Sequence, residues 1–139
     1  MLRIGVLAAI GFISVGANAI AQTPPPACHG AQQPKEIAEL LFGRDIGNRV
    51  GVSQSDFARF VAREVTPRFP DGLTVTDAVG LWRDRDSGRI VQEPSKHVEI
   101  VLPGNDDDEA RLDAIVSAYK RDFRQQSVGV IVRTACVSF

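Results

Sequence analysis

Residues 57–76 constrain the fold most, because this segment has to form the end of a helix, a turn and the start of a strand. Apolar side chains recur first at the spacing of one helix face: Phe57, Phe60, Val61 and Val65. Pro67 disfavours helical geometry at Thr66, so the helix is predicted to end there. Pro70-Asp71-Gly72 is typical of a turn, and the alternation that begins at Leu73 predicts a strand.

The whole chain is predicted to contain four strands and two helices, in the order β-α-β-β-α-β. Alternating apolar residues predict strands at 36–43, 73–83, 89–102 and 127–138. Ser53 and Asp56 resemble a capping box at the start of the first helix, and the acidic residues 106–109 favour the start of a second one.

Two of the predicted strands contain interruptions. Asp77 breaks the apolar alternation of the second strand, which predicts a bulge near Ala78 or Gly80. Pro94 predicts an irregularity in the third strand, because proline has no N–H to donate.

The element order predicts an α+β ferredoxin-like sandwich over residues 36–139, in which both helices cover one face of a four-stranded antiparallel sheet. Alternation assigns these residues to the covered face: Leu40, Phe42, Val75, Val79, Val98, Ile100, Val130 and Val132. The open face then consists of Ile37, Glu39, Leu41, Thr76, Ala78, Trp82, His97, Glu99, Val101, Ile131 and Arg133. Because this face is both apolar and ionisable, we expect it to bind a ligand or to pair with a second copy.

The N-terminal segment indicates export. Residues 1–21 combine a basic start, a short apolar run and small-residue cleavage signals at Ala19 and Ala21, which are typical of a secretory signal peptide. A Pro-rich linker at 22–35 follows. We therefore expect a periplasmic or secreted protein with no stable membrane insertion after cleavage.

The charge balance limits the class of binding partner, and the cysteine content indicates a disulfide. Loss of Arg3 with the signal peptide leaves 15 basic against 17 acidic residues, a balance that argues against nucleic acid as a partner. The only two cysteines are Cys28 and Cys136, and export favours a disulfide between them. Two free thiols, or a lipidated Cys28, are the alternatives.

Several separated blocks resemble one bacterial family, the domain of unknown function 3574. They are Leu41-Phe42-Gly43, residues 65–74 and 80–82, Glu93-Pro94-Ser95-Lys96, Tyr119-Lys120, residues 123–128 and Cys136-Val137-Ser138-Phe139. The resemblance covers about residues 36–139. It implies a small exported protein, often described as a lipoprotein, with no established activity. His97 and Glu39 are not part of the family pattern.

No strong catalytic motif is present, and we expect neither a cofactor nor a metal site. Only His29 and His97 are available as imidazole ligands. His97 and Glu99 lie two apart on one strand face, with Glu39 expected near them on the adjacent strand, so they are candidates for an acid/base pair. A polar dimer interface or a solvated surface explains the same residues.

Two further candidates concern ligand binding. If the turn after the first helix lies near the second strand of the hairpin, the following residues are predicted to form a small polar cleft for a carboxylate or phosphate: Arg68, Glu93, Ser95, Lys96, Gln126 and Ser127. Local pairing of these loop charges is the alternative. Trp82 is a candidate to stack a ring-shaped ligand or to anchor a partner, and plain packing explains it equally.

The sequence thus favours a non-enzymatic binding or interaction module that uses the open sheet face and forms a homodimer. A small cofactor-free enzyme acting on a small polar substrate is the alternative. The sequence names neither the substrate nor the partner.

Overall fold

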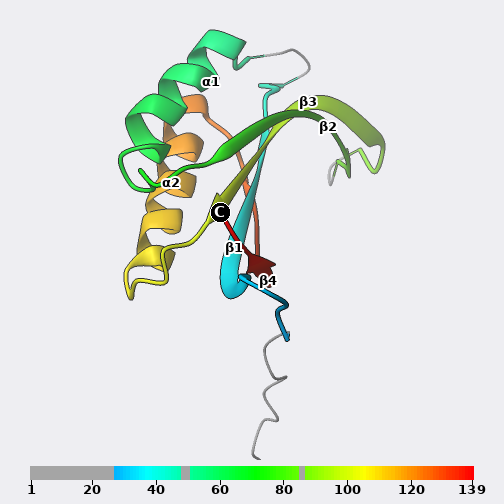
Figure 1. Ribbon diagram of the computed structural model, residues 1–139. Helices are drawn as coiled ribbons and strands as arrows, with labels where there is room; N and C mark the ends of the chain where they lie inside the picture. Colours follow the sequence, from blue (N-terminus) through cyan, green and yellow to red (C-terminus); the bar gives the residue numbers. More distant parts are fainter. Residues whose placement is uncertain (1–26, 48–50, 85–86) are drawn as a thin grey trace, which may run out of the picture.

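The computed structural model describes residues 27–47, 51–84 and 87–139, and its elements follow the predicted order (Figure 1). The strands are β1 (Gln33–Gly43), β2 (Thr74–Arg83), β3 (Ile90–Val101) and β4 (Gly129–Val137). The helices are α1 (Gln54–Phe60), its π-helical continuation η1 (Val61–Val65) and α2 (Asp108–Phe123). The predicted signal peptide, residues 1–21, lies outside the described residues.

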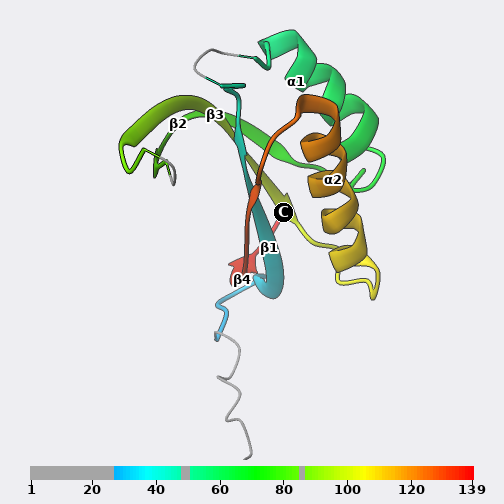
Figure 2. The ribbon, with the colours of Figure 1, turned by 180° about the vertical axis from the view of Figure 1, so that it is seen from behind.

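The sheet has the strand order β2-β3-β1-β4, and all neighbouring strands are antiparallel. Both helices lie on the same side of it, as the views from the front and from behind agree (Figures 1 and 2). The predicted ferredoxin-like fold is therefore confirmed, and one face of the sheet carries no helix.

The first helix begins and ends where the sequence predicts. Ser53 Oγ accepts the N–H of Asp56 at 3.1 Å, and the Asp56 carboxylate accepts the N–H of Ser53 at 3.2 Å, which completes the capping box. At the other end the N–H of Thr66 donates to Val61 O at 2.9 Å, so the last turn before Pro67 is π-helical. Gly72 has φ 136°, which explains why glycine occupies the following turn.

The second helix begins among the acidic residues 106–109, as predicted, and one of these acids has an additional role. It begins at Asp108, whose carboxylate accepts the N–H groups of Gly104 and Asn105 at 2.8 and 2.9 Å. This acid therefore holds the preceding turn in place in addition to lying at the positive end of the helix dipole.

The predicted bulge and irregularity in the hairpin are wrong. The β2–β3 register runs without an inserted residue from Thr74 opposite Glu99 to Arg83 opposite Ile90. Asp77 fits the covered face because its carboxylate pairs with Lys96 Nζ at 2.7 Å.

Pro94 fits the regular ladder because the carbonyl opposite its missing N–H, that of Arg44, accepts hydrogen bonds from other donors. Its own carbonyl accepts the N–H of Arg44 at 3.1 Å. The Arg44 carbonyl in turn accepts the N–H groups of Gly51 and Val52 at 2.9 and 3.0 Å, so no acceptor is left without a partner by the missing proline N–H.

An aromatic cluster forms the centre of the core between the sheet and the helices. Its rings pack edge to face or tilted, with centroids 4.7–6.1 Å apart: Phe42, Phe57, Phe60, Tyr119 and Phe123. The Tyr119 hydroxyl donates to Gly43 O at 2.8 Å, and burial raises the pKa of this phenol above its usual value.

The helices cover the two central strands and leave the edges of the same face exposed. Leu40, Phe42, Val98 and Ile100, on β1 and β3, are 0 % exposed, as predicted for the covered face. The other predicted members of that face lie on the edge strands and are 40–59 % exposed: Val75, Val79, Val130 and Val132. Two helices are too narrow to shield all four strands.

Beyond the helices, the β2–β3 hairpin curls away from them (Figures 1 and 2). Because it bends away from the covered side, the side of the hairpin that continues the open face lies on the inside of the curve. The open face is therefore concave along the hairpin.

A disulfide joins the two ends of the domain, as predicted. Cys28 precedes β1 and Cys136 lies in β4, with an S–S distance of 2.05 Å and a Cα–Cα distance of 5.5 Å. β1 itself begins at Gln33, three residues before the predicted domain boundary at 36, because Gln33, Pro34 and Lys35 pair with β4. No helix in the described part of the chain is long and apolar enough to cross a membrane.

Candidate functional site on the open sheet face

Four ionisable side chains from three strands meet on the open face around Glu39. His97 Nε2 on β3 lies 3.2 Å from Glu39 Oε2, and Arg133 Nε on β4 donates to Glu39 Oε1 at 2.7 Å. Arg133 also lies 3.6 Å from Glu99, which is opposite Glu39 in the β1–β3 register. We call these four residues the Glu39 cluster.

The electrostatics of the cluster keep its central carboxylate ionised. The hydrogen bond from Arg133 lowers the pKa of Glu39 below its ordinary value, with smaller contributions from the charge of Arg133 and from His97. Burial opposes this effect. Glu39 therefore acts as an anionic anchor that fixes the positions of His97 and Arg133.

In the predicted acid/base pair, the carboxylate that contacts His97 is not Glu99. His97 contacts Glu39 on the neighbouring strand, whereas Glu99 lies against Arg133. Two open depressions, of about 220 and 440 Å³, lie elsewhere: one at the ends of β1 and β4, the other between the start of α1 and the end of α2. Neither is lined by His97.

Apolar side chains surround the Glu39 cluster. Leu41 is 44 % exposed and Ile131 46 %, and they lie beside His97 and Glu39 in the register. Trp82, 42 % exposed, continues the same face along the hairpin, as predicted. Ile37 belongs to this face by register but is only 4 % exposed, between Val101 and Arg133.

The predicted polar cleft does not form, because its members lie in different places. Arg68 pairs with Glu64 at 3.0 Å and its carbonyl accepts a hydrogen bond from Arg111, near the start of α2. Glu93 lies beside Asp45, whose carbonyl is bound by Gln125 beyond the end of α2. The two charges are thus at opposite ends of a helix of 16 residues, which is about 24 Å long.

The remaining members of that cleft are separated by strand alternation and by the loop. Lys96 and Ser95 are adjacent in β3, so their side chains point to opposite faces, and Lys96 is buried under α1 over the Phe57 ring. Gln126 and Ser127 are exposed in the loop before β4.

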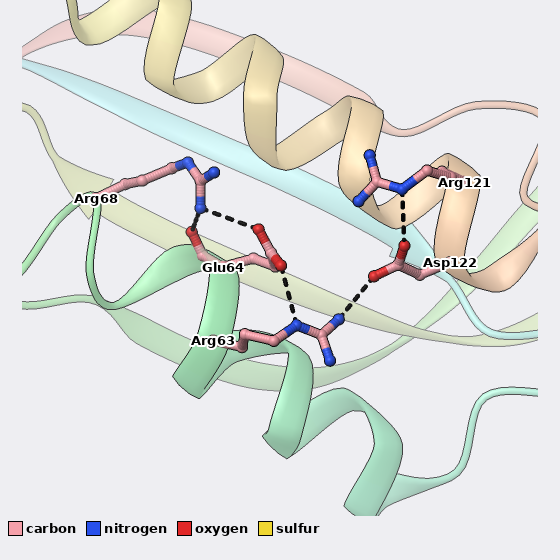
Figure 3. A network of polar contacts seen from close by, with 5 residues as sticks. All are labelled: Arg63, Glu64, Arg68, Arg121 and Asp122. Carbon is pink, nitrogen blue, oxygen red and sulfur yellow. Dashed lines mark hydrogen bonds and ion pairs between the residues drawn. The ribbon is translucent and has the colours of Figure 1, made fainter.

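Arg68 instead belongs to a network that joins η1 to α2 (Figure 3). Glu64 accepts hydrogen bonds from Arg68 and, at 2.9 Å, from Arg63. Arg63 reaches across to Asp122 at 2.6 Å, and Asp122 also accepts from Arg121 at 3.0 Å. These contacts are largely solvent-exposed, so they orient the two helices and contribute little stability.

Sequence reasoning missed one contact on the open face, between Glu93 and the backbone of Asp45. The signal for it is present, because Gly43 and Gly80 lie inside predicted strands, where glycine often marks the close approach of another group. In the described part of the chain, no three metal-ligating side chains lie close enough together to hold an ion.

Comparisons with known proteins identify the family of this chain and solved structures that share its fold. The family model "Protein of unknown function (DUF3574)" matches residues 37–139. No curated protein matches the chain.

Several solved structures share the fold, among them the following three. A phage SAM lyase in complex with S-methyl-5'-thioadenosine superposes with a TM-score of 0.60 at 18 % identity, covering 84 % of this chain and 97 % of the lyase. The apo state of a phage SAM lyase gives 0.57 at 16 % identity, with the same coverage. CutA from Synechococcus elongatus with Bis-Tris gives 0.50 at 11 % identity, covering 77 % of this chain and 87 % of CutA. At these identities the likeness concerns the fold alone.

Proposed function

Because the chain belongs to the DUF3574 family of proteins of unknown function, we propose its role from its own geometry: an exported interaction module that self-associates through the open sheet face. The observation that carries this proposal is the uncovered part of the face over β1 and β4, where Leu41 and Ile131 are each more than 40 % exposed.

The composition of the face supports a second copy of the chain as the partner. Arg133 faces both carboxylates of the Glu39 cluster within one copy, and Glu39 also contacts His97 Nε2. Covering a face whose carboxylates already have a partner costs less than covering unpaired ions. Packing two such sheets face to face over β1 and β4 buries the exposed apolar side chains of that part of the face in both copies, and the curled hairpin with Trp82 lies outside the proposed contact.

Export is part of the proposal. Residues 1–21 have the pattern of a signal peptide, and a disulfide between Cys28 and Cys136 suits an oxidising compartment such as the periplasm. The lipidated alternative is disfavoured because the sulfur of Cys28 is bonded to that of Cys136.

Leu41→Glu is expected to abolish self-association, because it places an unpaired charge at the centre of the apolar part of the face. The mass of the mature chain, measured by light scattering over a range of concentrations, is expected to be that of a dimer in the wild type and of a monomer in Leu41→Glu. Ser117→Glu, on the exposed side of α2, is the matched control and is expected to remain dimeric. A monomeric wild type at high concentration contradicts the proposal.

A second candidate is favoured by the contact of His97 with Glu39 at 3.2 Å, which is the arrangement of a carboxylate-supported acid or base. The reaction to test first is SAM cleavage, since a SAM lyase shares the fold. SAM consumption by the mature wild type, reduced at least about tenfold in His97→Gln, supports this candidate, whose acid/base contribution is typically 10²–10⁴-fold. Absence of consumption by the wild type removes SAM as the substrate.

A further inference from the structure

Glu93 lies in an unusual position on the inner side of the curled hairpin. Its Oε2 accepts the N–H of Asp45 at 3.2 Å. A Cβ atom at Gly43 would lie 2.7 Å from Glu93 Oε1, and a Cβ at Gly80 would lie 3.8 Å from Glu93 Cγ. The carboxylate therefore extends over a floor that two glycines, from β1 and β2, leave free of side chains.

This carboxylate has no cationic partner in the part of the chain that the structure describes. Neither of the two buried cations nearby forms an ion pair with Glu93: Lys96 pairs with Asp77 at 2.7 Å, and Arg44 Nε donates to Val52 O at 2.8 Å. Glu93 is itself half-buried. A partly buried carboxylate without a counter-charge attracts a cation from outside.

An aromatic ring flanks the same place. Trp82 is opposite Val91 in the β2–β3 register, and Gly80 is opposite Glu93, so Trp82 lies one step along the same side. Diagonal neighbours at this separation are within reach of long aromatic side chains. Ala78, Gly80 and Ser95 complete this side with small residues, and the curl of the hairpin makes it concave (Figures 1 and 2).

We propose that Glu93 and Trp82 form a binding site for an organic ammonium cation. The carboxylate supplies the opposite charge, the indole supplies a face for cation–π contact, and the glycine floor leaves room for the alkyl substituents. A carboxylate and an indole do not form the oxygen cage that a calcium or magnesium ion requires, which favours an organic cation. The proposal depends on the hairpin and its neighbour Gly43, and it does not require self-association.

Trp82 is the only tryptophan in the chain, so its fluorescence reports on this site directly. Choline is the probe, and 3,3-dimethyl-1-butanol, in which carbon replaces the charged nitrogen, is the neutral control. We expect choline to change the emission of the mature wild type saturably and the neutral alcohol to have no comparable effect. If the emission change does not saturate with choline, or if both compounds change the emission equally, the proposal is overturned.

Two variants test the role of the carboxylate. Glu93→Gln keeps an acceptor for the Asp45 N–H but removes the charge, and it is expected to weaken choline binding about tenfold or more. Gly43→Ala is expected to weaken it as well, because the new Cβ displaces the carboxylate. Glu109→Gln, on the exposed start of α2, is the matched control and is expected to bind like the wild type. Wild-type affinity in Glu93→Gln contradicts the proposed role.

The same titration on Leu41→Glu separates this proposal from self-association. Choline binding that persists in a monomeric Leu41→Glu supports the site even if the dimer proposal fails. Circular dichroism of each variant confirms that the fold is intact before its affinity is interpreted, and a folded Leu41→Glu without choline binding contradicts a site that one copy forms alone.

Discussion

Phe42→Ala is expected to lower the free energy of unfolding by about 3–5 kcal/mol, the range typical for a fully buried phenylalanine. Phe42 is 0 % exposed and lies where β1 meets both helices. Its ring packs edge to face against Phe57, Phe60 and Tyr119, with centroids 5.4, 5.9 and 4.7 Å away. Truncation leaves a cavity that no neighbouring backbone can close, because each partner ring is held by the others.

Urea unfolding followed by circular dichroism measures this loss. Phe42→Leu, which keeps most of the volume, is expected to lose less than half as much, and Leu81→Ala, at a side chain 66 % exposed on β2, is expected to lose under about 1 kcal/mol. If Phe42→Ala and Leu81→Ala were equally stable, the aromatic cluster would not be the centre of the core.

Replacing both cysteines by serine is expected to cost about 2–5 kcal/mol. The bridge joins residues 108 apart, so in the unfolded chain it closes a loop that contains almost the whole domain. It also fixes the N-terminal end of β1 against β4, because Pro34 is opposite Cys136 in their register. Most of the effect is therefore expected on the unfolded state, with a smaller part from fraying of β4.

The double variant Cys28→Ser/Cys136→Ser is compared with the wild type before and after reduction by dithiothreitol. The reduced wild type and the variant are expected to have the same lowered midpoint of unfolding. If reduction left the midpoint of the wild type unchanged, the bridge would contribute nothing to stability.

The fold was predictable because local signals and the global arrangement agree. Ser53, Pro67 and Gly72 mark the limits of one helix and one turn, and each does in the structure what its chemistry predicts. Alternation correctly separated the covered residues of the central strands, such as Leu40 and Val98, from those of the open face.

The errors came from contacts that no local pattern contains. A charged residue in an apolar alternation indicates a bulge when considered alone, but Asp77 has a buried partner on the next strand, Lys96. Pro94 is harmless only because the loop after β1 supplies two donors to the Arg44 carbonyl. Asp77 and Lys96 lie on different strands, and Arg44 is 50 residues from Pro94 in sequence, so neither compensation is visible in a local pattern.

The candidate site was predictable in part for the same reason. The alternation of side chains along the strands places His97, Glu99 and Trp82 on one face. It does not determine which carboxylate contacts the imidazole of His97, and the β1–β3 register brings Glu39 to it. The predicted polar cleft required Arg68 near Glu93, and the length of α2 separates them. A bulge is predicted near Gly80, whereas in the structure Gly80, like Gly43, makes room for Glu93.

The central claim is that the open sheet face over β1 and β4 is covered by a second copy in the assembled protein. It is tested most directly by the rate at which a maleimide reagent labels Leu41→Cys as protein concentration rises, with Ser117→Cys on α2 as the reference. The account predicts that labelling at position 41 slows with concentration while labelling at position 117 stays constant. Rates at both positions that do not change with concentration would contradict it.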